Sequence, residues 1–331
     1  MKATPARWLW LLPATFLVGL LLAPLARLLI EGGATEGADW AWWQDAHLRW
    51  RMGWSVLQAA ATCALVLVLG LPVAWVLARV EFAGRRWVLR VLMLPFVVPT
   101  LVAAMGVLAL LGPRGWAGQW GFDLEETPWL LLYGNLFFNL CVLVRTAVDA
   151  LERVSAQRLA AARTLGATPW RAFWRIEWPA ILPAVGAALC LVFLYCFAGF
   201  GLALVLGGQR YATVEVEIYT LVAHELQLAQ AGELALWTLA GMSAVALVYA
   251  AVSRHLAAPE RADRVPRLPV RGVVLHAAVA AALCLLAVVC GAPLLALWVK
   301  AWRAGWGAWV VWTEPETLAA LGNTLRFTGA A

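Results

Sequence analysis

The sequence predicts an all-α, polytopic bundle of membrane-spanning helices. Of its 331 residues, 63% are hydrophobic and only 13% are charged, whereas a soluble domain carries roughly 25% charged residues. Apolar runs of about 20 residues, the length of a helix that crosses a bilayer, follow one another along the chain. The segments between these runs are alternately basic and acidic, as expected where successive loops lie on opposite sides of a membrane.

Seven complete spans are expected, and an eighth begins near the end of the sequence. We place them at residues 9–30, 54–78, 88–111, 129–148, 180–206, 234–252 and 273–299, with the eighth starting near 317. Residues 1–30 have the look of a signal peptide, but the apolar run is too long and lacks a clear small-residue cleavage site. We therefore interpret this segment as a retained first helix.

The charge of the loops predicts the orientation. Cytoplasmic loops carry the excess of Lys and Arg, which places the N-terminus in the cytoplasm. The main exceptions to this pattern, on the opposite side, are Arg49, Arg51, Lys300 and Arg303. The net charge of +6 is explained by basic loops beside membrane lipid, so no nucleic-acid partner is predicted.

Proline and glycine interrupt two of the spans. Gly70 and Pro72 lie in the second span, and Pro95 and Pro99 lie in the third. Proline removes a backbone hydrogen bond and kinks a helix, and such breaks are tolerated where other helices or a cavity satisfy the freed carbonyl. The pattern is equally compatible with a translocation pathway lined by broken helices and with ordinary kinking for packing.

Two further groups are candidates for the same pathway. Asn135 and Asn139 lie four residues apart on one face of the fourth span. Amides placed in this way usually bind a neighbouring helix, which we favour over lining a pathway. Tyr195, Phe197 and Phe200 lie among glycines in the fifth span. They would suit stacking on a flat or cationic ligand, but we favour close helix packing.

Outside the fifth span, the run Gly207-Gly208-Gln209 predicts a turn, and residues 211–219 predict a short external helix. This helix carries the acids Glu215 and Glu217. It either contacts a periplasmic partner or is a solvated face.

The segment 149–183 is a long charged loop between two spans, with five arginines, and is expected to form two helical pieces. The first runs to about Leu165. Gly166 then permits a bend that other residues would resist. Thr168 is a good N-cap for the second piece, and Pro169 falls at its first position, where a missing N–H costs nothing.

The second piece is expected to be short and amphipathic. Trp170, Phe173 and Trp174 share one face, while Arg171 and Arg175 share another. A helix of this kind, held outside the bilayer, suits a docking surface.

The same residues carry a resemblance to a known family. Ala161-Ala162-Arg163-Thr164-Leu165-Gly166, followed after nine residues by Ile176-Glu177-Trp178-Pro179, resembles the EAA loop of ABC importer permeases. The family pattern is Glu-Ala-Ala, three residues, Gly, nine residues and Ile-x-Leu-Pro. Here Ala160 replaces the Glu and Trp178 replaces the Leu. In that family the loop forms a coupling helix seated in a cleft of the ATP-binding subunit. The resemblance therefore implies a coupling role for Ala161, Ala162, Gly166, Thr168, Pro169, Trp170, Arg171, Phe173, Trp174, Arg175, Ile176 and Pro179.

Within this family the chain resembles the fused two-unit permeases that import thiamine, which are close to those that import ferric iron. The resemblance is most specific in the EAA loop, at 195–200 and at 207–219. It implies the type I (MetI-like) importer permease fold in a bacterial inner membrane. It also implies an ATP-binding subunit and a periplasmic binding protein that delivers thiamine or its phosphates. Ferric iron is the alternative substrate, and a non-transporting membrane scaffold is the alternative class.

No catalytic chemistry is expected of the chain itself. It has no GxxxxGK[ST] phosphate loop, so ATP is expected on a partner subunit and no cofactor on this chain. The six cysteines lie within apolar spans and lack metal-ligand spacing, so no metal site is expected. HExxH and GxSxG are absent, and no Asp or Glu lies deep in a span, which argues against a membrane enzyme.

After a linker, the pattern of the N-terminus resumes. Residues 253–272 are rich in Pro and Arg, which is typical of a boundary. An apolar span with a proline near its end and a Trp-rich segment then follow, as they do at the start of the chain. The sequence thus predicts a six-span permease unit at 1–252, a cytoplasmic linker at 253–272 and the start of a second, truncated unit at 273–331. We expect the chain to be the N-terminal portion of a longer two-unit permease.

Overall fold

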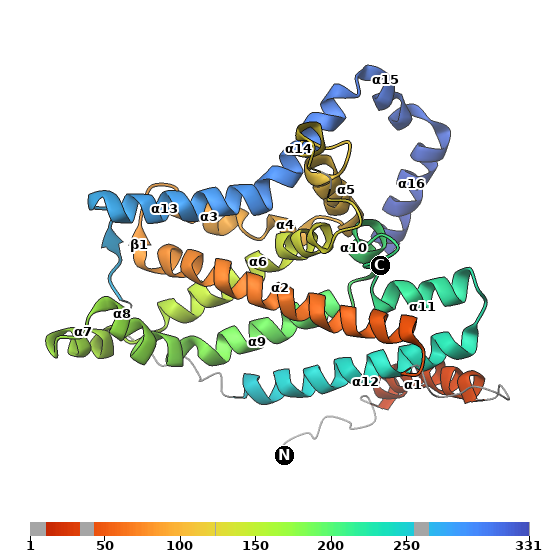
Figure 1. Ribbon diagram of the computed structural model, residues 1–331, viewed down its shortest axis with the longest axis horizontal. Helices are drawn as coiled ribbons and strands as arrows, with labels where there is room; N and C mark the ends of the chain where they lie inside the picture. Colours follow the sequence, from red (N-terminus) through yellow and green to blue (C-terminus); the bar gives the residue numbers. More distant parts are fainter. Residues whose placement is uncertain (1–10, 34–42, 123, 255–264, 331) are drawn as a thin grey trace, which may run out of the picture.

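The chain folds into a helical bundle, which confirms the predicted fold class (Figure 1). The structure is a computed structural model that describes residues 11–33, 43–122, 124–254 and 265–330. Five helical segments there are long and apolar enough to cross a membrane, at 46–79, 128–152, 169–197, 228–253 and 272–303. A sixth joins them if the bent pair 85–97 and 100–111 is one span. The predicted first span forms the helix α1 (Leu11–Gly33), while residues 9 and 10 lie outside the described part.

The centre of the bundle consists of α2 (Ala46–Arg79), α6 (Pro128–Glu152) and α9 (Trp178–Phe197), which pack against one another. The helix α12 (Leu228–Ser253) covers α9, and α1 lies against α12. Figure 1 shows the short helices α7 (Ala156–Thr164) and α8 (Pro169–Ala172) at one end of the bundle and α11 (Val214–Ala223) at the other.

Two predicted spans are not single helices. The third, expected at 88–111, consists of α3 (Arg85–Val91), α4 (Leu94–Val97) and α5 (Thr100–Leu111), with a bend of 104° between α4 and α5. Val98 is extended because it precedes Pro99. The fifth, expected at 180–206, stops at Phe197 and resumes as α10 (Phe200–Leu206). Its break falls at Ala198 and Gly199, without a proline.

The two asparagines of α6 serve helix packing, as favoured from the sequence. Asn135 Nδ2 donates to Gln58 Oε1 of α2 at 2.7 Å, and Gln58 Nε2 donates to the Cys196 carbonyl of α9 at 2.8 Å. Asn139 Nδ2 donates to the Asn135 carbonyl at 2.9 Å and lies 3.4 Å from Cys196 Sγ. These buried amides join the three central helices through hydrogen bonds in an otherwise apolar core.

The end of the linker and the segment after it pack against the bundle. A short strand β2 (Leu268–Pro269) pairs in parallel with β1 (Val80–Glu81), the continuation of α2. The helix α13 (Gly272–Leu286), a π-turn (Ala287–Gly291) and α14 (Ala292–Arg303) then run along α2, α6 and α5. The last elements are α15 (Trp306–Trp309), a short 3-10 turn and α16 (Pro315–Ala330); α15 stands away from the bundle, and α16 turns back toward it (Figure 1).

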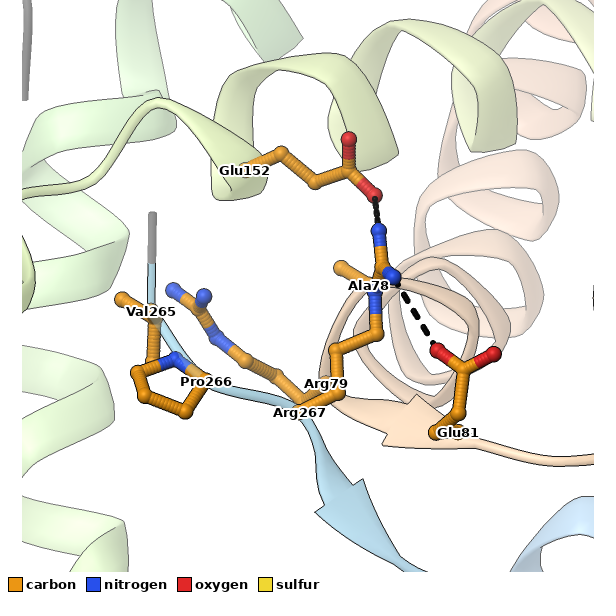
Figure 2. Close-up of a pocket in the computed structure, with 7 residues that line it drawn as sticks. All are labelled: Ala78, Arg79, Glu81, Glu152, Val265, Pro266 and Arg267. Atoms are coloured by element: carbon orange, nitrogen blue, oxygen red, sulfur yellow. Dashed lines mark hydrogen bonds and ion pairs between the residues drawn. The ribbon is translucent and has the colours of Figure 1, made fainter. Parts of the chain in front are cut away.

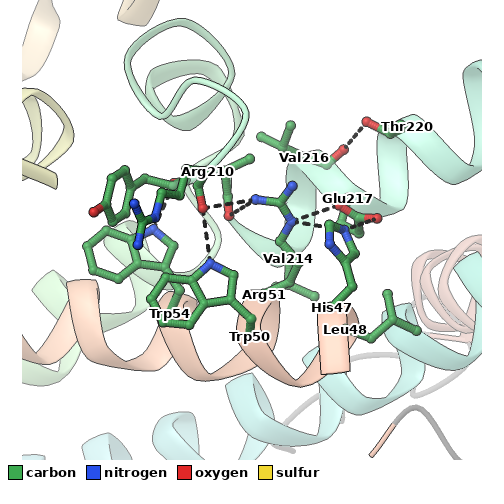
Figure 3. Close-up of polar contacts among 12 residues, drawn as sticks. His47, Leu48, Trp50, Arg51, Trp54, Arg210, Val214, Val216, Glu217 and Thr220 are labelled. Carbon is green, nitrogen blue, oxygen red and sulfur yellow. Dashed lines mark hydrogen bonds and ion pairs between the residues drawn. The ribbon is translucent and has the colours of Figure 1, made fainter. Parts of the chain in front are cut away.

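A buried ion pair explains one of the basic residues on the external side. Arg51 of α2 donates from Nε to Glu217 Oε2 of α11 at 2.9 Å, and His47 Nε2 lies 3.1 Å from Glu217 Oε1 (Figure 3). Arg51 Nη1 also donates to the carbonyls of Arg210 and Ala212. Neither interpretation of the external helix therefore holds for Glu217, because this acid faces inward and holds α11 to α2.

The crossing of α5 and α14 depends on a small residue. A Cβ added at Gly106 would lie 2.9 Å from the Pro293 carbonyl oxygen, which is backbone and cannot rotate away. We expect Gly106→Ala to lower the free energy of unfolding by about 1–3 kcal/mol, the usual effect of overpacking. Thermal unfolding of the detergent-solubilised protein would measure this. Gly53→Ala, which has open space in α2, is the control and should be neutral or slightly stabilising. Equal behaviour of the two variants would contradict the close crossing.

Candidate functional site

The bend predicted in the loop between α6 and α9 is present. Ser155 caps α7 by accepting a hydrogen bond from the Arg158 N–H, and the helix ends in a left-handed residue, Gly166, with φ +79°. The N–H groups of Gly166 and Ala167 bond the carbonyls of Arg163 and Ala162, both at 3.0 Å. Glycine is required at this position for its backbone freedom, since a Cβ would meet nothing within 4 Å.

The second helical piece also begins as predicted but does not end as predicted. Thr168 Oγ1 accepts from the Arg171 N–H at 3.3 Å, and Pro169 occupies the first turn of α8. We expected a short, separate helix, whereas α8 continues through a π-turn (Phe173–Glu177) into α9. Pro179 explains this difference, because it has no backbone N–H to donate to the carbonyl four residues earlier, as a regular α-helix requires. The π-turn, with the Trp178 N–H bonding the Phe173 carbonyl, allows the helix to continue.

The tip of the loop presents apolar and basic side chains to solvent. Leu165 is 88% exposed and Trp170 is 69% exposed. The Trp174 ring lies in edge contact with the rings of Trp170, at 5.5 Å between centroids, and of Phe173, at 5.3 Å. Within the described residues, none of the loop's five arginines is in a salt bridge: Arg153, Arg158, Arg163, Arg171 and Arg175. Exposed large apolar groups next to unpaired cations are typical of an interaction surface.

The remaining predicted loop residues support this tip. Ala161 and its neighbour Ala162 lie on α7, exposed and half-buried respectively. Ile176 is half-buried in the π-turn and packs against the core, and Pro179 is exposed on the first turn of α9. The small side chains on α7 leave its surface open between the arginines.

Two buried ion pairs hold the base of the loop, and sequence reasoning missed both. Glu177 lies at the junction of the π-turn and α9. Its carboxylate accepts hydrogen bonds from Arg79 Nε at 2.8 Å and from Trp75 Nε1 at 3.1 Å, both of α2. Arg79 and Glu177 are each 4% exposed. The sequence did show Glu177 as a lone acid beside a long apolar run, which could have indicated a buried pair, but its partner Arg79 is 98 residues away.

The second pair anchors the linker at the same end of the bundle. Glu152, the last residue of α6, accepts from Arg85 of α3 and from Arg267, which precedes β2, and Arg267 also donates to Glu81 at 3.0 Å. Glu81, Glu152 and Arg267 line a cavity of about 340 Å³ (Figure 2). Burial alone would lower the pKa of Arg267, but its bonds to Glu152 and Glu81 outweigh burial and raise it.

The candidate pathway residues divide into two groups. Phe197 is buried and stacks on Phe193, and a Cβ at Gly201 would lie 2.9 Å from Thr100 Oγ1, so close packing governs this side. Tyr195 is exposed and contacts Phe96 at 5.8 Å between centroids, next to the buried Pro95.

The exposed aromatic face continues beyond the break in the fifth span. Phe200 is also exposed and contacts Tyr219 at 5.3 Å, and Pro99 lies exposed at the bend of the third span. Broken helices and aromatic rings thus share an exposed face, on which the buried Asn135 and Asn139 do not appear.

A bundle of apolar spans with an exposed loop of this kind defines a multi-pass membrane protein of the permease class. Residues 67–258, more than half of the chain, match the family described as "Binding-protein-dependent transport system inner membrane component". The chain belongs to this family of permease components.

Individual relatives agree with this assignment. The chain is 32% identical to the thiamine transport system permease protein ThiP of Escherichia coli K12 over 238 residues, which cover 69% of this chain and 44% of the relative. It is 33% identical to ThiP of Brucella abortus, in an alignment that covers 70% of this chain and 46% of the relative. It is 30% identical to the sulfate transport system permease protein CysT of E. coli, in an alignment that covers 61% of this chain and 74% of the relative. The chain thus spans about half the length of the ThiP relatives.

A solved structure shows the same fold. A bacterial ABC transporter involved in the import of the acidic polysaccharide alginate has a chain that aligns with a TM-score of 0.62 at 18% identity. The alignment covers 76% of this chain and 96% of that one. The likeness extends to the architecture of the bundle.

The ion pair at the loop base should be required for stability. Glu177→Ala would leave Arg79 buried without a counter-charge, and we expect a loss of about 3–5 kcal/mol of unfolding free energy. Replacing both residues, as Arg79→Met with Glu177→Leu, should restore most of it. Asp149→Ala removes a carboxylate from an exposed pair with Arg145 at the same end and should cost less than about 1 kcal/mol. Thermal unfolding in detergent would rank the stabilities of the variants. If Glu177→Ala were as stable as Asp149→Ala, the buried pair could not have the predicted role.

Proposed function

We propose that this chain forms the translocation pathway of an ATP-driven importer and that its loop docks on an ATP-binding subunit. The observation that carries the docking proposal is the loop tip, where Leu165 and Trp170 stand exposed beside five arginines that form no salt bridge with any described residue. Such a surface requires an apolar cleft rimmed by acids. The chain has no phosphate loop of its own, so a partner must supply the energy.

The substrate that we propose is thiamine or one of its phosphates, delivered by a periplasmic binding protein. Support comes from the ThiP relatives at about one-third identity and from the resemblance of residues 195–200 and 207–219 to that subgroup. Sulfate is a second candidate, favoured by the likeness to CysT. The third candidate substrate, ferric iron, is supported only by the resemblance of the sequence to ferric iron permeases. Tyr195, Phe200 and Phe96 are the side chains of the described part that we expect along the pathway.

We further propose that the six-span unit at 1–252 is followed by a cytoplasmic linker, at 253–272, and by the start of a second unit, at 273–331. The repeated pattern of span, Trp-rich segment and second span supports this division. The N-terminus is then cytoplasmic, and α7 and α8 lie on the cytoplasmic side with the ATP-binding subunit.

The docking role can be tested at the bend. Gly166→Val should weaken association with the ATP-binding subunit at least tenfold, because a β-branched residue at positive φ distorts the turn. Gly166→Asn, which tolerates this conformation, is the matched control and should retain most binding. Co-purification of the complete permease with its ATP-binding subunit, together with ATP hydrolysis in lipid, would measure both. Normal association of the valine variant would contradict the docking role of this loop.

The substrate can be tested in the same reconstituted system. Binding proteins loaded with thiamine, thiamine pyrophosphate, sulfate or ferric iron would be added one at a time while ATP hydrolysis is recorded. We expect stimulation by the thiamine-loaded protein alone, because only the cognate loaded protein engages the permease productively. Stimulation by the sulfate- or iron-loaded protein would keep the transporter and replace the substrate. No response to any of them, with no ATP-binding subunit bound, would favour a scaffold.

A further inference from the structure

An apolar groove lies between the broken third span and the helix that follows the linker. Its volume is 400 Å³, within the range of small-ligand sites. One wall comes from α3 and α4, with Trp87, Val91 and Leu94, and the other from α13 and the π-turn, with Leu283 and Leu286. Gly291 leaves part of this second wall open, because a Cβ there would meet nothing within 4 Å. The groove has the width and the lining that a hydrocarbon chain requires.

Two arginines lie on α3, the helix that forms one wall of this groove: Arg90 borders the lining residue Trp87, and Arg86 lies one turn earlier. Arg86 and Arg90 lie four residues apart on the exposed face of α3, and the Arg90 guanidinium carbon lies 5.1 Å from the centre of the Trp87 ring. In the part of the chain that the structure covers, neither forms a salt bridge. Like charges at this spacing repel each other, and no carboxylate of the described residues offsets this repulsion by a salt bridge.

Neighbouring acids are already paired and cannot neutralise this pair. Glu152 accepts from Arg85 and Arg267, and Glu81 accepts from Arg267. Within the described residues, Arg86 and Arg90 are therefore available to attract an anion from outside the chain. At the interface between an apolar groove and water, a phosphate attached to acyl chains supplies both the charge and the hydrocarbon.

We propose that this groove is a binding site for an anionic phospholipid. One acyl chain lies between α3–α4 and α13, and the phosphate contacts Arg86 and Arg90. The exposed Trp87 sits between the two, where an indole ring favours the headgroup region. The lipid joins the broken third span to the segment after the linker and fits the anionic inner leaflet, where basic pockets between helices bind such headgroups. The site depends on the membrane location of the chain and is independent of the transported substrate.

Native mass spectrometry of the complete permease, delipidated and then titrated with phosphatidylglycerol or phosphatidylethanolamine, would test the site. We expect the wild type to retain phosphatidylglycerol in preference. Arg86→Gln with Arg90→Gln should lower its occupancy about tenfold, since each cation adds to the attraction for an anionic lipid. Arg171→Gln with Arg175→Gln removes two charges at the same spacing from the loop and is the matched control; it should leave retention unchanged.

A second variant tests the groove apart from its charges. A Cβ at Gly291 meets nothing within 4 Å, and Gly291→Leu replaces glycine by a better helix former, so the fold should persist, as checked by size-exclusion chromatography. It should abolish retention of phosphatidylglycerol. Equal retention of both lipids, equal loss in the control, or full retention by Gly291→Leu would overturn the proposal. So would binding of glycerol phosphate without acyl chains, or a wild type that retains no lipid because another helix fills the groove.

Discussion

The buried contact between Glu177 and Arg79 is the constraint on which the rest of the structure depends. It fixes the start of α9 to the end of α2 where both helices leave the apolar core. A charge in such a place is tolerated only with its partner and with further hydrogen bonds, here from Trp75. The loop above this contact can therefore be fully exposed and still have a fixed position, because its base cannot slide along the bundle.

Breaks in the helices, more than the helices themselves, shape the region beyond this anchor. The bend of 104° at Pro99 and the interruption at Gly199 bring α5 and α10 together, and Gly201 allows them to touch at Thr100. The backbone freed at such breaks needs other helices or water to satisfy it. Tyr195 and Phe200 lie exposed on either side of the break at Gly199, in contact with Phe96 and Tyr219.

Local chemistry predicted the fold class, most of the long helices and the turn at Gly166, because each depends on residues within a few positions of one another. The break at Gly199 was missed, since glycine in an apolar run is compatible with packing as well as with interruption. The ion pairs of Glu177 and Glu217 could not be predicted, because their partners are about 100 and 166 residues away. The continuity of α8 with α9 was missed because Pro179 normally ends a helix, and only a π-turn rescues it.

That continuity has a mechanical consequence. From Pro169 to Phe197 the chain is one helical rod of 29 residues, about 43 Å long at 1.5 Å per residue. With Glu177 held by Arg79 as the pivot, the part of the rod that runs to Phe197 is about 30 Å long, so a tilt of about 10° displaces that end by about 5 Å, roughly one helical turn. The rod ends at Tyr195 and Phe197, beside the break at Gly199. A small push on the exposed tip is thus magnified at the opposite side of the bundle, and the π-turn is the place where the lever can yield.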